Sequence, residues 1–303
     1  MAHELALAID IGGTKMAAGL VDRSGALLVR TQAPTPSGAD AAVLFDTLVG
    51  VVTALDAVGA DHGISSADAT ICGVGCGGPM TRGGATVSPV NIVGWRAFPL
   101  RARLVEHLGL PVHVDNDAKA LALGEGWVGA ARGCSDYLAM VVSTGVGGGI
   151  VLDGRLLDGA AGNAGHIGHI VVEPDGHPCA CGARGCLEAE ASGTAIATIT
   201  GRPAAEADPA MVRRTGTLVG RAVSVVANLC DLRTAVVAGS VALGFGQPFL
   251  EAANAELDAR ARLDFSSGAR LGFAGLGDQG PLVGAAAVAF AGAGLPVLGG
   301  STT

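Results

Sequence analysis

Two stretches of the chain repeat one pattern of apolar strand, glycine-rich turn and second strand. In the first, the apolar run Leu5–Ile11 leads through a glycine turn into Met16–Val21. In the second, Tyr137–Val142 leads through Ser143–Gly149 into Ile150–Leu152. A third extended stretch follows each pair after another turn. The repeat predicts two related α/β halves in one chain.

Helical periodicity separates these strands. We expect helices at Ala41–Val58, Leu100–Leu108, Ala118–Val128, Met211–Cys230, Gln247–Leu263 and Leu282–Ala293, and further strands at Ala69–Val74, Val112–Val114 and Thr234–Ala238. The alternation favours an α/β fold with mainly parallel central pairing. Leu282–Ala293 is interpreted as a buried helix, with a bilayer span as the alternative.

Composition narrows the class of protein. The 303 residues are 50% hydrophobic, enough for two domains, and the net charge of −8 with 3% aromatics argues against nucleic-acid binding. Seven cysteines, an odd number without an extracellular pattern, favour a reducing cytoplasm. The start Met1–Glu4 has no basic segment of the kind that opens a signal peptide, so neither secretion nor a membrane partner is expected.

Four potential metal ligands lie close together in the sequence. They are His169, Cys179, Cys181 and Cys186. Three thiolates and one imidazole suit a closed tetrahedral Zn²⁺ site with a structural role. The alternative is a glycine-rich loop whose thiols are adjacent by chance.

Two glycine turns offer backbone amides to phosphate oxygens. In the first turn the strand-end acid Asp10 precedes Gly12, Gly13, Thr14 and Lys15, and a carboxylate at such a place can hold Mg²⁺. Ser143–Gly149 is the second. Paired turns on duplicated halves predict a clamp for a nucleoside triphosphate, and the sequence contains no P-loop motif.

A third glycine run, Gly73–Gly78, has the spacing of a dinucleotide fingerprint. A dinucleotide site requires a helix to begin there. Pro79 and Gly83-Gly84 follow instead, so we interpret this run as a loop that lies against a small ligand.

An acid at a strand-to-helix junction is the candidate base. Asp117 follows Asn116 where the strand near Val114 passes into a helix. Asp117 is either an N-cap or a general base that takes a proton from an attacking hydroxyl, with Asn116 bound to the substrate. Asn91 is placed near the same pocket, and Trp95 is expected to be a core residue.

With both glycine turns, the Asn-Asp pair and the cysteine motif, the chain resembles the ROK family of bacterial sugar kinases and repressors over nearly its full length. The resemblance implies an actin-like, ribonuclease H-like fold with an interdomain active-site cleft. It implies a small domain of residues 1–115 with 281–303, and a large domain of residues 116–280 that carries the zinc loop. It also implies ATP with Mg²⁺, structural Zn²⁺, and a homodimer or homotetramer.

Residue roles follow from the same resemblance. Asp117 is the catalytic base. The sugar contacts are Gly78, Asn91, Asn116, Asp117, His166, His169 and Glu188. The nucleotide contacts are Asp10, Gly12, Gly13, Thr14, Lys15, Thr144, Gly145, Gly147, Gly239 and Ser240. His169 would ligate zinc with one ring nitrogen and touch a sugar hydroxyl with the other.

Two positions depart from the family pattern. His166 stands where ROK glucokinases usually carry Glu, and N-acetylmannosamine kinases are similar to this chain in having His. A neutral His has one donor and one acceptor where Glu only accepts, so selectivity at the sugar's C1–C2 edge is expected to change, unless the substitution is neutral. Lys119 stands in place of a common Asn and is expected to point away from the sugar.

The sequence therefore predicts an ATP-dependent hexose 6-kinase, with glucose as the first candidate substrate and N-acetylmannosamine as the second. Other hexoses, or polyphosphate as the phosphate donor, remain open. The first glycine turn begins almost at the N-terminus, so no DNA-binding helix-turn-helix is expected before it. The alternative from another class is a sugar sensor without catalysis, and an NAD-dependent enzyme is disfavoured.

Overall fold

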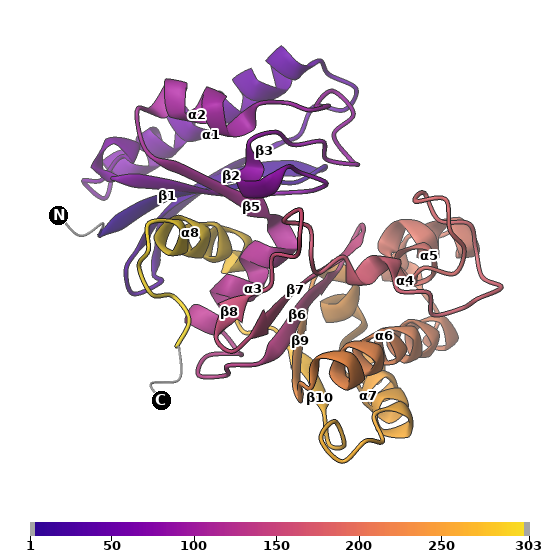
Figure 1. Cartoon of the computed structure of the whole chain (residues 1–303). Coiled ribbons are helices and arrows are strands. Elements are labelled where there is room, and N and C mark those ends of the chain that lie inside the picture. Colours follow the sequence, from indigo (N-terminus) through magenta and orange to yellow (C-terminus); the bar gives the residue numbers. More distant parts are fainter. Residues whose placement is uncertain (1–3, 300–303) are drawn as a thin grey trace. The chain divides into compact units, whose positions relative to one another are not determined.

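The computed structural model describes residues 4–299, which form two compact units, each containing one mixed sheet (Figure 1). The first unit comprises the described residues up to Arg132 together with Asp158–Ala164 and Leu276–Gly299. The second comprises Gly133–Leu157 and Gly165–Gly275. The expected domains, divided at residue 115, differ in extent from these units, because the helix that follows residue 116 packs with the first unit.

The sheet of the first unit has the order β3-β2-β1-β4-β5, in which the first three strands pair antiparallel and the last three parallel. Its strands are β1 (Leu5–Ile11), β2 (Lys15–Asp22), β3 (Leu27–Pro34), β4 (Ile71–Cys76) and β5 (Val112–Asn116). Its helices are α1 (Ala41–Ala60), α2 (Leu100–Leu108), α3 (Asp117–Trp127) and α8 (Gly280–Gly292).

The two faces of this sheet carry different side chains. On β1 the large residues Leu7, Ile9 and Ile11 belong to the hydrophobic core with the buried face of α1. The opposite face packs against α8, which approaches so closely that a Cβ on Gly73 of β4 would overlap the Ala285 carbonyl at 1.9 Å. Asp10 alternates with the large residues and therefore lies on the α8 side.

The sheet of the second unit has the order β10-β9-β6-β7-β8. Its strands are β6 (Tyr137–Val142), β7 (Val146–Leu152), β8 (Arg155–Leu156), β9 (Thr234–Ala238) and β10 (Arg270–Phe273). Its helices are α4 (Leu187–Ala191), α5 (Gly193–Thr200), α6 (Pro209–Cys230) and α7 (Ser240–Arg260). The paired helices α6 and α7 supply most of the helical side of its core.

Both sheets have the same connectivity. The hairpin β1-β2-β3 corresponds to β6-β7-β8, and the parallel strands β4 and β5 correspond to β9 and β10. The duplication predicted from the repeated strand–turn–strand pattern is therefore present in the structure. In each half, the carboxyl ends of three parallel strands lie at one edge of the sheet.

Two expectations about elements need correction, and strand β10 was missed. The second glycine run is not one loop. Strand β7 begins at Val146, so Gly147, Gly148 and Gly149 belong to the sheet and pair with β6. The helix expected at Gln247–Leu263 is α7, which begins at Ser240 and kinks at Gly246, where φ is +61°. Strand β10 was not predicted, since its four residues include only two large apolar side chains.

Two apolar helices bear on the membrane question. Helix α8 is nearly all buried, as expected for Leu282–Ala293, and at 13 residues it is shorter than a bilayer span. Helix α1 has the length and hydropathy of a span, with a window mean of 1.9. Its buried positions Leu44, Leu48, Val51 and Leu55 recur at helical spacing and pack into the core, which accounts for its apolar composition.

Candidate functional site

The first unit brings two carboxylates together where its parallel strands end. The strand register sets Asp10 of β1 beside Gly75 of β4 and Gly75 beside Asp115 of β5. A Cβ built on Gly75 would lie 3.7 Å from the Asp10 Oδ1 atom and 3.6 Å from the Asp117 Cα atom. Gly75, which has no side chain, therefore lies between the predicted acids Asp10 and Asp117. Sequence reasoning did not single out Gly75, although it lies within the run weighed as a dinucleotide motif.

Burial changes the protonation of Asp10. The side chain is almost completely enclosed on the α8 face, and this burial, together with the negative charge of Asp117, raises the pKa of Asp10 to about 7. Lys15 acts in the opposite direction. A divalent cation beside Asp10 would favour the ionised carboxylate, so the group fits the Mg²⁺ ligand predicted from the sequence.

Helix α3 begins at the predicted base. Asn116 is its N-cap, accepting from the Ala118 backbone N–H at 3.0 Å, and Asp117 Oδ1 accepts from the same N–H at 2.9 Å. The cap uses the side-chain oxygen Oδ1 of Asn116. The side-chain nitrogen Nδ2 keeps its two donors for a ligand. The alternative role for Asp117, as the N-cap, is thus taken by its neighbour.

The first glycine turn is exposed and is closed by hydrogen bonds. The Gly12 N–H donates to the Lys15 carbonyl at 2.9 Å, and the Thr35 hydroxyl donates to the Gly12 carbonyl at 2.7 Å. Asn91 packs directly on the turn, since a Cβ on Gly13 would lie 2.6 Å from the Asn91 Cβ atom. Asn91 thus lies beside the predicted phosphate turn.

In the second unit the other glycine turn meets the start of α7. The Ser143 N–H donates to the Gly145 carbonyl at 2.9 Å, and the Ser143 and Ser240 hydroxyl oxygens are 2.9 Å apart. Gly239, with φ +102°, precedes α7 and lies so close to β6 that a Cβ would overlap the Val142 carbonyl at 2.3 Å. The predicted nucleotide residues Thr144, Gly145, Gly239 and Ser240 therefore gather at one sheet edge, and sequence analysis missed the role of Ser143 in joining them.

Glu188 lies against the same turn. Its Oε2 atom accepts from the Val146 N–H at 3.0 Å, and a Cβ on Gly145 would be 2.9 Å from that oxygen. Gly147, also predicted to bind nucleotide, lies within β7 opposite Val141. The predicted sugar ligand Glu188 and the predicted phosphate turn thus share one hydrogen-bonded contact.

The four predicted metal ligands form one cluster. Their ligand atoms all lie within 4.8 Å of one another, with Cys181 Sγ 3.7 Å from Cys186 Sγ and Cys179 Sγ 3.7 Å from His169 Nδ1. Tetrahedral bonds of about 2.3 Å from zinc to sulfur place two sulfur atoms about 3.8 Å apart. The two distances of 3.7 Å agree with this spacing, so the cluster could hold a zinc ion.

The thiols of this cluster ionise unequally without a cation. Hydrogen bonds from the Ala183 backbone and from Cys179 lower the pKa of Cys181. Burial and the neighbouring thiols raise the pKa of Cys186 to about 12. A bound divalent cation favours the thiolate form of all three. Because His169 turns Nδ1 toward the cysteines, its Nε2 atom is left for a second partner.

The turn that carries His166 and His169 is fixed on β7. Gly168 lies so close to Val146 that a Cβ would be 2.3 Å from the Val146 carbonyl oxygen. The two imidazole rings are exposed and stacked, with centroids 6.0 Å apart. His166, His169 and Glu188 therefore surround the start of β7.

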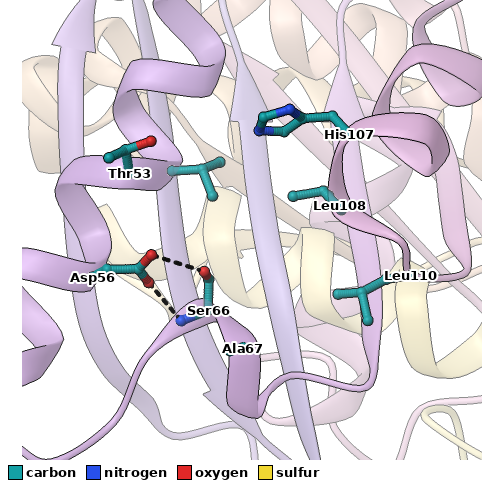
Figure 2. Close-up of a pocket in the computed structure, with 8 residues that line it drawn as sticks. Thr53, Asp56, Ser66, Ala67, His107, Leu108 and Leu110 are labelled. Atoms are coloured by element: carbon teal, nitrogen blue, oxygen red, sulfur yellow. Dashed lines mark hydrogen bonds between the residues drawn. The ribbon is translucent and has the colours of Figure 1, made fainter.

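A separate hollow of about 390 Å³ lies on the first unit, between α1 and the end of α2 (Figure 2). Its most polar group, the Asp56 carboxylate, accepts from the backbone N–H of Ser66 at 2.6 Å and from its hydroxyl at 3.1 Å. None of the predicted site residues lines this hollow.

Two solved structures with the same fold are sugar kinases by their titles. A ROK hexokinase from Thermus thermophilus aligns with a TM-score of 0.77 and 32% identity, covering 96% of this chain and 99% of that one. A ROK glucokinase from Streptomyces griseus, in complex with glucose and AMPPNP, aligns with a TM-score of 0.80 and 32% identity, covering 94% and 99%. The predicted actin-like two-domain α/β class is thus confirmed.

The ROK family profile matches residues 6–291, and the chain belongs to the ROK family. An N-acetylmannosamine kinase from Citrobacter koseri is 37% identical over 257 residues, covering 79% of this chain and 84% of that protein. A glucokinase from Halalkalibacterium halodurans is 43% identical over 195 residues, covering 63% of this chain and only 57% of the glucokinase. The predicted family is confirmed, and these relatives are kinases, as the sequence predicts.

Proposed function

We propose that the protein is an ATP-dependent hexose 6-kinase with glucose as its substrate and Asp117 as the general base. The observation that carries the proposal is the Asp10–Asp117 pair, separated only by Gly75 and flanked by the Gly12–Lys15 turn. A buried acid with a raised pKa beside a second acid is an arrangement typical of catalytic sites, which favours an enzyme over a sugar-binding module without catalysis.

The chain's own residues divide the work of phosphoryl transfer. Asp117 accepts the proton of the 6-hydroxyl as that oxygen attacks the γ-phosphorus, and Asn116 orients the sugar through its amide nitrogen. The backbone amides of the Gly12–Lys15 and Ser143–Gly145 turns donate to phosphate oxygens, with Gly239 and Ser240 on the adenosine side. Mg²⁺ held near Asp10 would neutralise charge on the phosphates.

The cysteine cluster is assigned a structural zinc ion. Its role is to hold the loop that begins at His169, so that His169 Nε2 and Glu188 are presented to the sugar. The observation behind this assignment is the spacing of 3.7 Å between the Cys181 and Cys186 sulfur atoms and between the Cys179 sulfur and His169 Nδ1.

N-acetylmannosamine is the second candidate substrate. His166 favours it, since its imidazole offers a donor that the usual Glu does not, and relatives with that activity by name align over 79% of this chain. The exposed position of His166 on the turn fixed by Gly168 agrees with a ligand contact.

The substrate is tested by ADP release with Mg·ATP and each of glucose, N-acetylmannosamine, mannose, fructose and glucosamine. A preference for glucose supports the first proposal, and a preference for N-acetylmannosamine replaces it with the second. The variant His166→Glu separates them further, because it should shift a preference for N-acetylmannosamine toward glucose and leave a glucose preference unchanged. Zinc-loaded, folded protein that is silent with every sugar would refute the kinase assignment and favour a sensor.

We further propose a cytoplasmic homodimer or homotetramer, as the family resemblance implies. Light scattering of the purified protein would give the mass of the assembly, and a monomer at micromolar concentration would contradict this part of the proposal.

A further inference from the structure

A short segment, Asp158–Ala164, belongs to the first unit although the residues on both sides of it belong to the second. We call these seven residues the strap. The strap leaves strand β8, folds on itself through the bond from the Ala164 N–H to the Asp158 carbonyl at 3.0 Å, and continues into the turn that carries His166. The strap is therefore a segment of the first unit that is continuous in sequence with the His166 turn.

Lys119 is the main anchor of the strap. Its side chain is 2% exposed, and its Nζ atom lies 2.6 Å from Asp158 Oδ1, 3.0 Å from Asp115 Oδ1 and 3.4 Å from the Gly162 carbonyl. One buried ammonium thus joins Asp115 at the end of β5 to Asp158 and the Gly162 carbonyl of the strap. A buried ammonium that loses its partners is strongly unfavourable, so Lys119 stabilises the strap in this position. The sequence-based expectation for Lys119 is only that it points away from the sugar, and it does not include these contacts.

Two further side chains fix the strap. The Arg82 guanidinium donates to the Gly159 carbonyl at 3.0 Å. The Asn163 amide pairs with the backbone of Met80, accepting at 3.3 Å and donating at 3.0 Å. Both Arg82 and Met80 lie in the segment that follows Gly78, so the strap is tied to the residues next to a predicted sugar contact.

The strap and its contacts lie close in sequence to predicted sugar-site residues. Met80 is two residues after Gly78, Lys119 is two residues after Asp117, and the strap ends at Ala164, two residues before His166. A displacement of the strap would therefore move the backbone next to three sugar-site residues, while the nucleotide turns have no bond to it among the contacts described for residues 4–299.

We infer that Lys119 is a positioning residue for sugar binding, which it supports through the strap and without touching the sugar. The inference rests on the proposed function, because the sugar-site residues it positions are those of the proposed kinase. The Lys119–Asp158 ion pair is the strap contact that the substitutions below remove.

The first measurement is hydrogen exchange of residues 158–164 in the wild type, Lys119→Met and Asp158→Asn. Asp158 is 59% exposed, so its variant keeps the fold even where Lys119→Met does not. Asp258→Asn is the matched control, since it removes an exposed Asp–Arg pair, with Arg270, on the second unit. We expect residues 158–164 to exchange faster than in wild type in both strap variants, and at the wild-type rate in the control.

The second measurement is sugar affinity by calorimetry, together with KM and kcat. We expect sugar Kd and KM to rise about tenfold in Asp158→Asn, the loss that one charge-assisted hydrogen bond produces. The KM for ATP and kcat should stay within about twofold of wild type. A purely structural role would lower the amount of active protein and leave sugar KM unchanged.

The outcomes separate the two proposals. Wild-type protein that binds a sugar without phosphorylating it refutes the kinase proposal, and sugar Kd still tests the strap. Unchanged strap exchange in Asp158→Asn, or faster exchange with unchanged sugar affinity, overturns the assignment of Lys119. Equal losses of ATP and sugar affinity would overturn it as well.

Discussion

Replacing Asp10 with Asn should stabilise the protein at neutral pH although it removes a predicted magnesium ligand. The carboxyl has a pKa of about 7 in the folded protein, raised by burial and by Asp117, against 3.8 for an ordinary Asp. Because the folded pKa is the higher one, ionisation of Asp10 opposes folding. Its unfavourable contribution is absent below pH 3.8, grows between pH 3.8 and 7, and is constant above that range.

The size of the effect follows from the two pKa values. The full difference corresponds to about 4 kcal/mol of unfolding free energy lost at pH 8. Between pH 5 and pH 8 the part that changes is about 3 kcal/mol. This difference between two pH values cancels any pH-independent consequence of the amide, such as an altered hydrogen bond. It is therefore the quantity to measure.

Urea unfolding followed by tryptophan fluorescence suits this measurement, because both tryptophans, Trp95 and Trp127, lie in the unit that contains Asp10. In buffer without magnesium, Asp10→Asn should gain stability over wild type from pH 5 to pH 8. Asp46→Asn, an exposed change on α1, should show no such gain. A stability difference between Asp10→Asn and wild type that is the same at both pH values would refute the reasoning. Added Mg²⁺ should stabilise the wild type more than the variant.

Three other changes test the remaining parts of the site. Asp117→Asn should lower kcat by roughly 10²–10⁴ with an unchanged circular dichroism spectrum, and near-native turnover would remove the base assignment. Metal analysis should find about one zinc per chain, lost in Cys186→Ser, and metal-free folded wild type would contradict the site. Gly168→Ala should lower the melting temperature, since its Cβ would lie 2.3 Å from the Val146 carbonyl. Gly272→Ala, with no atom within 4 Å of its Cβ, should not, and equal melting shifts would count against the close packing.

Much of the fold could be predicted because strands and amphipathic helices leave local signals. The apolar run before each glycine turn marked β1 and β6, and helix α2 was predicted at its observed bounds, Leu100–Leu108. Local signals failed where a helix contains its own breakers. The predicted helix began at Gln247, directly after Gly246, whose non-helical backbone separates the first turns of α7 from the rest.

The candidate site was predictable only in part, because sequence motifs do not report burial. The spacing of His169 and the three cysteines predicted a cluster that the structure forms. Lys119 shows the opposite case. One turn into a helix, it carried no local sign of burial, and its principal partner Asp158 is 39 residues away. Such long-range pairing depends on the path of the whole chain and leaves no periodic trace.

The duplicated sheets also explain why the chemistry is unevenly divided between the halves. Val141 of β6 is the counterpart of Asp10 of β1, since each is the next-to-last residue of its strand. Asp10 pairs with Ala17 on β2 and Gly75 on β4, and Val141 pairs with Gly147 on β7 and Ala238 on β9. A second buried carboxylate would carry its own desolvation cost of the kind seen at Asp10. The second half instead presents backbone amides and the Ser143 and Ser240 hydroxyls, which remain neutral at every working pH. The same strand-end geometry thus occurs twice in the fold, and the halves differ there because β1 carries Asp10 where β6 carries Val141.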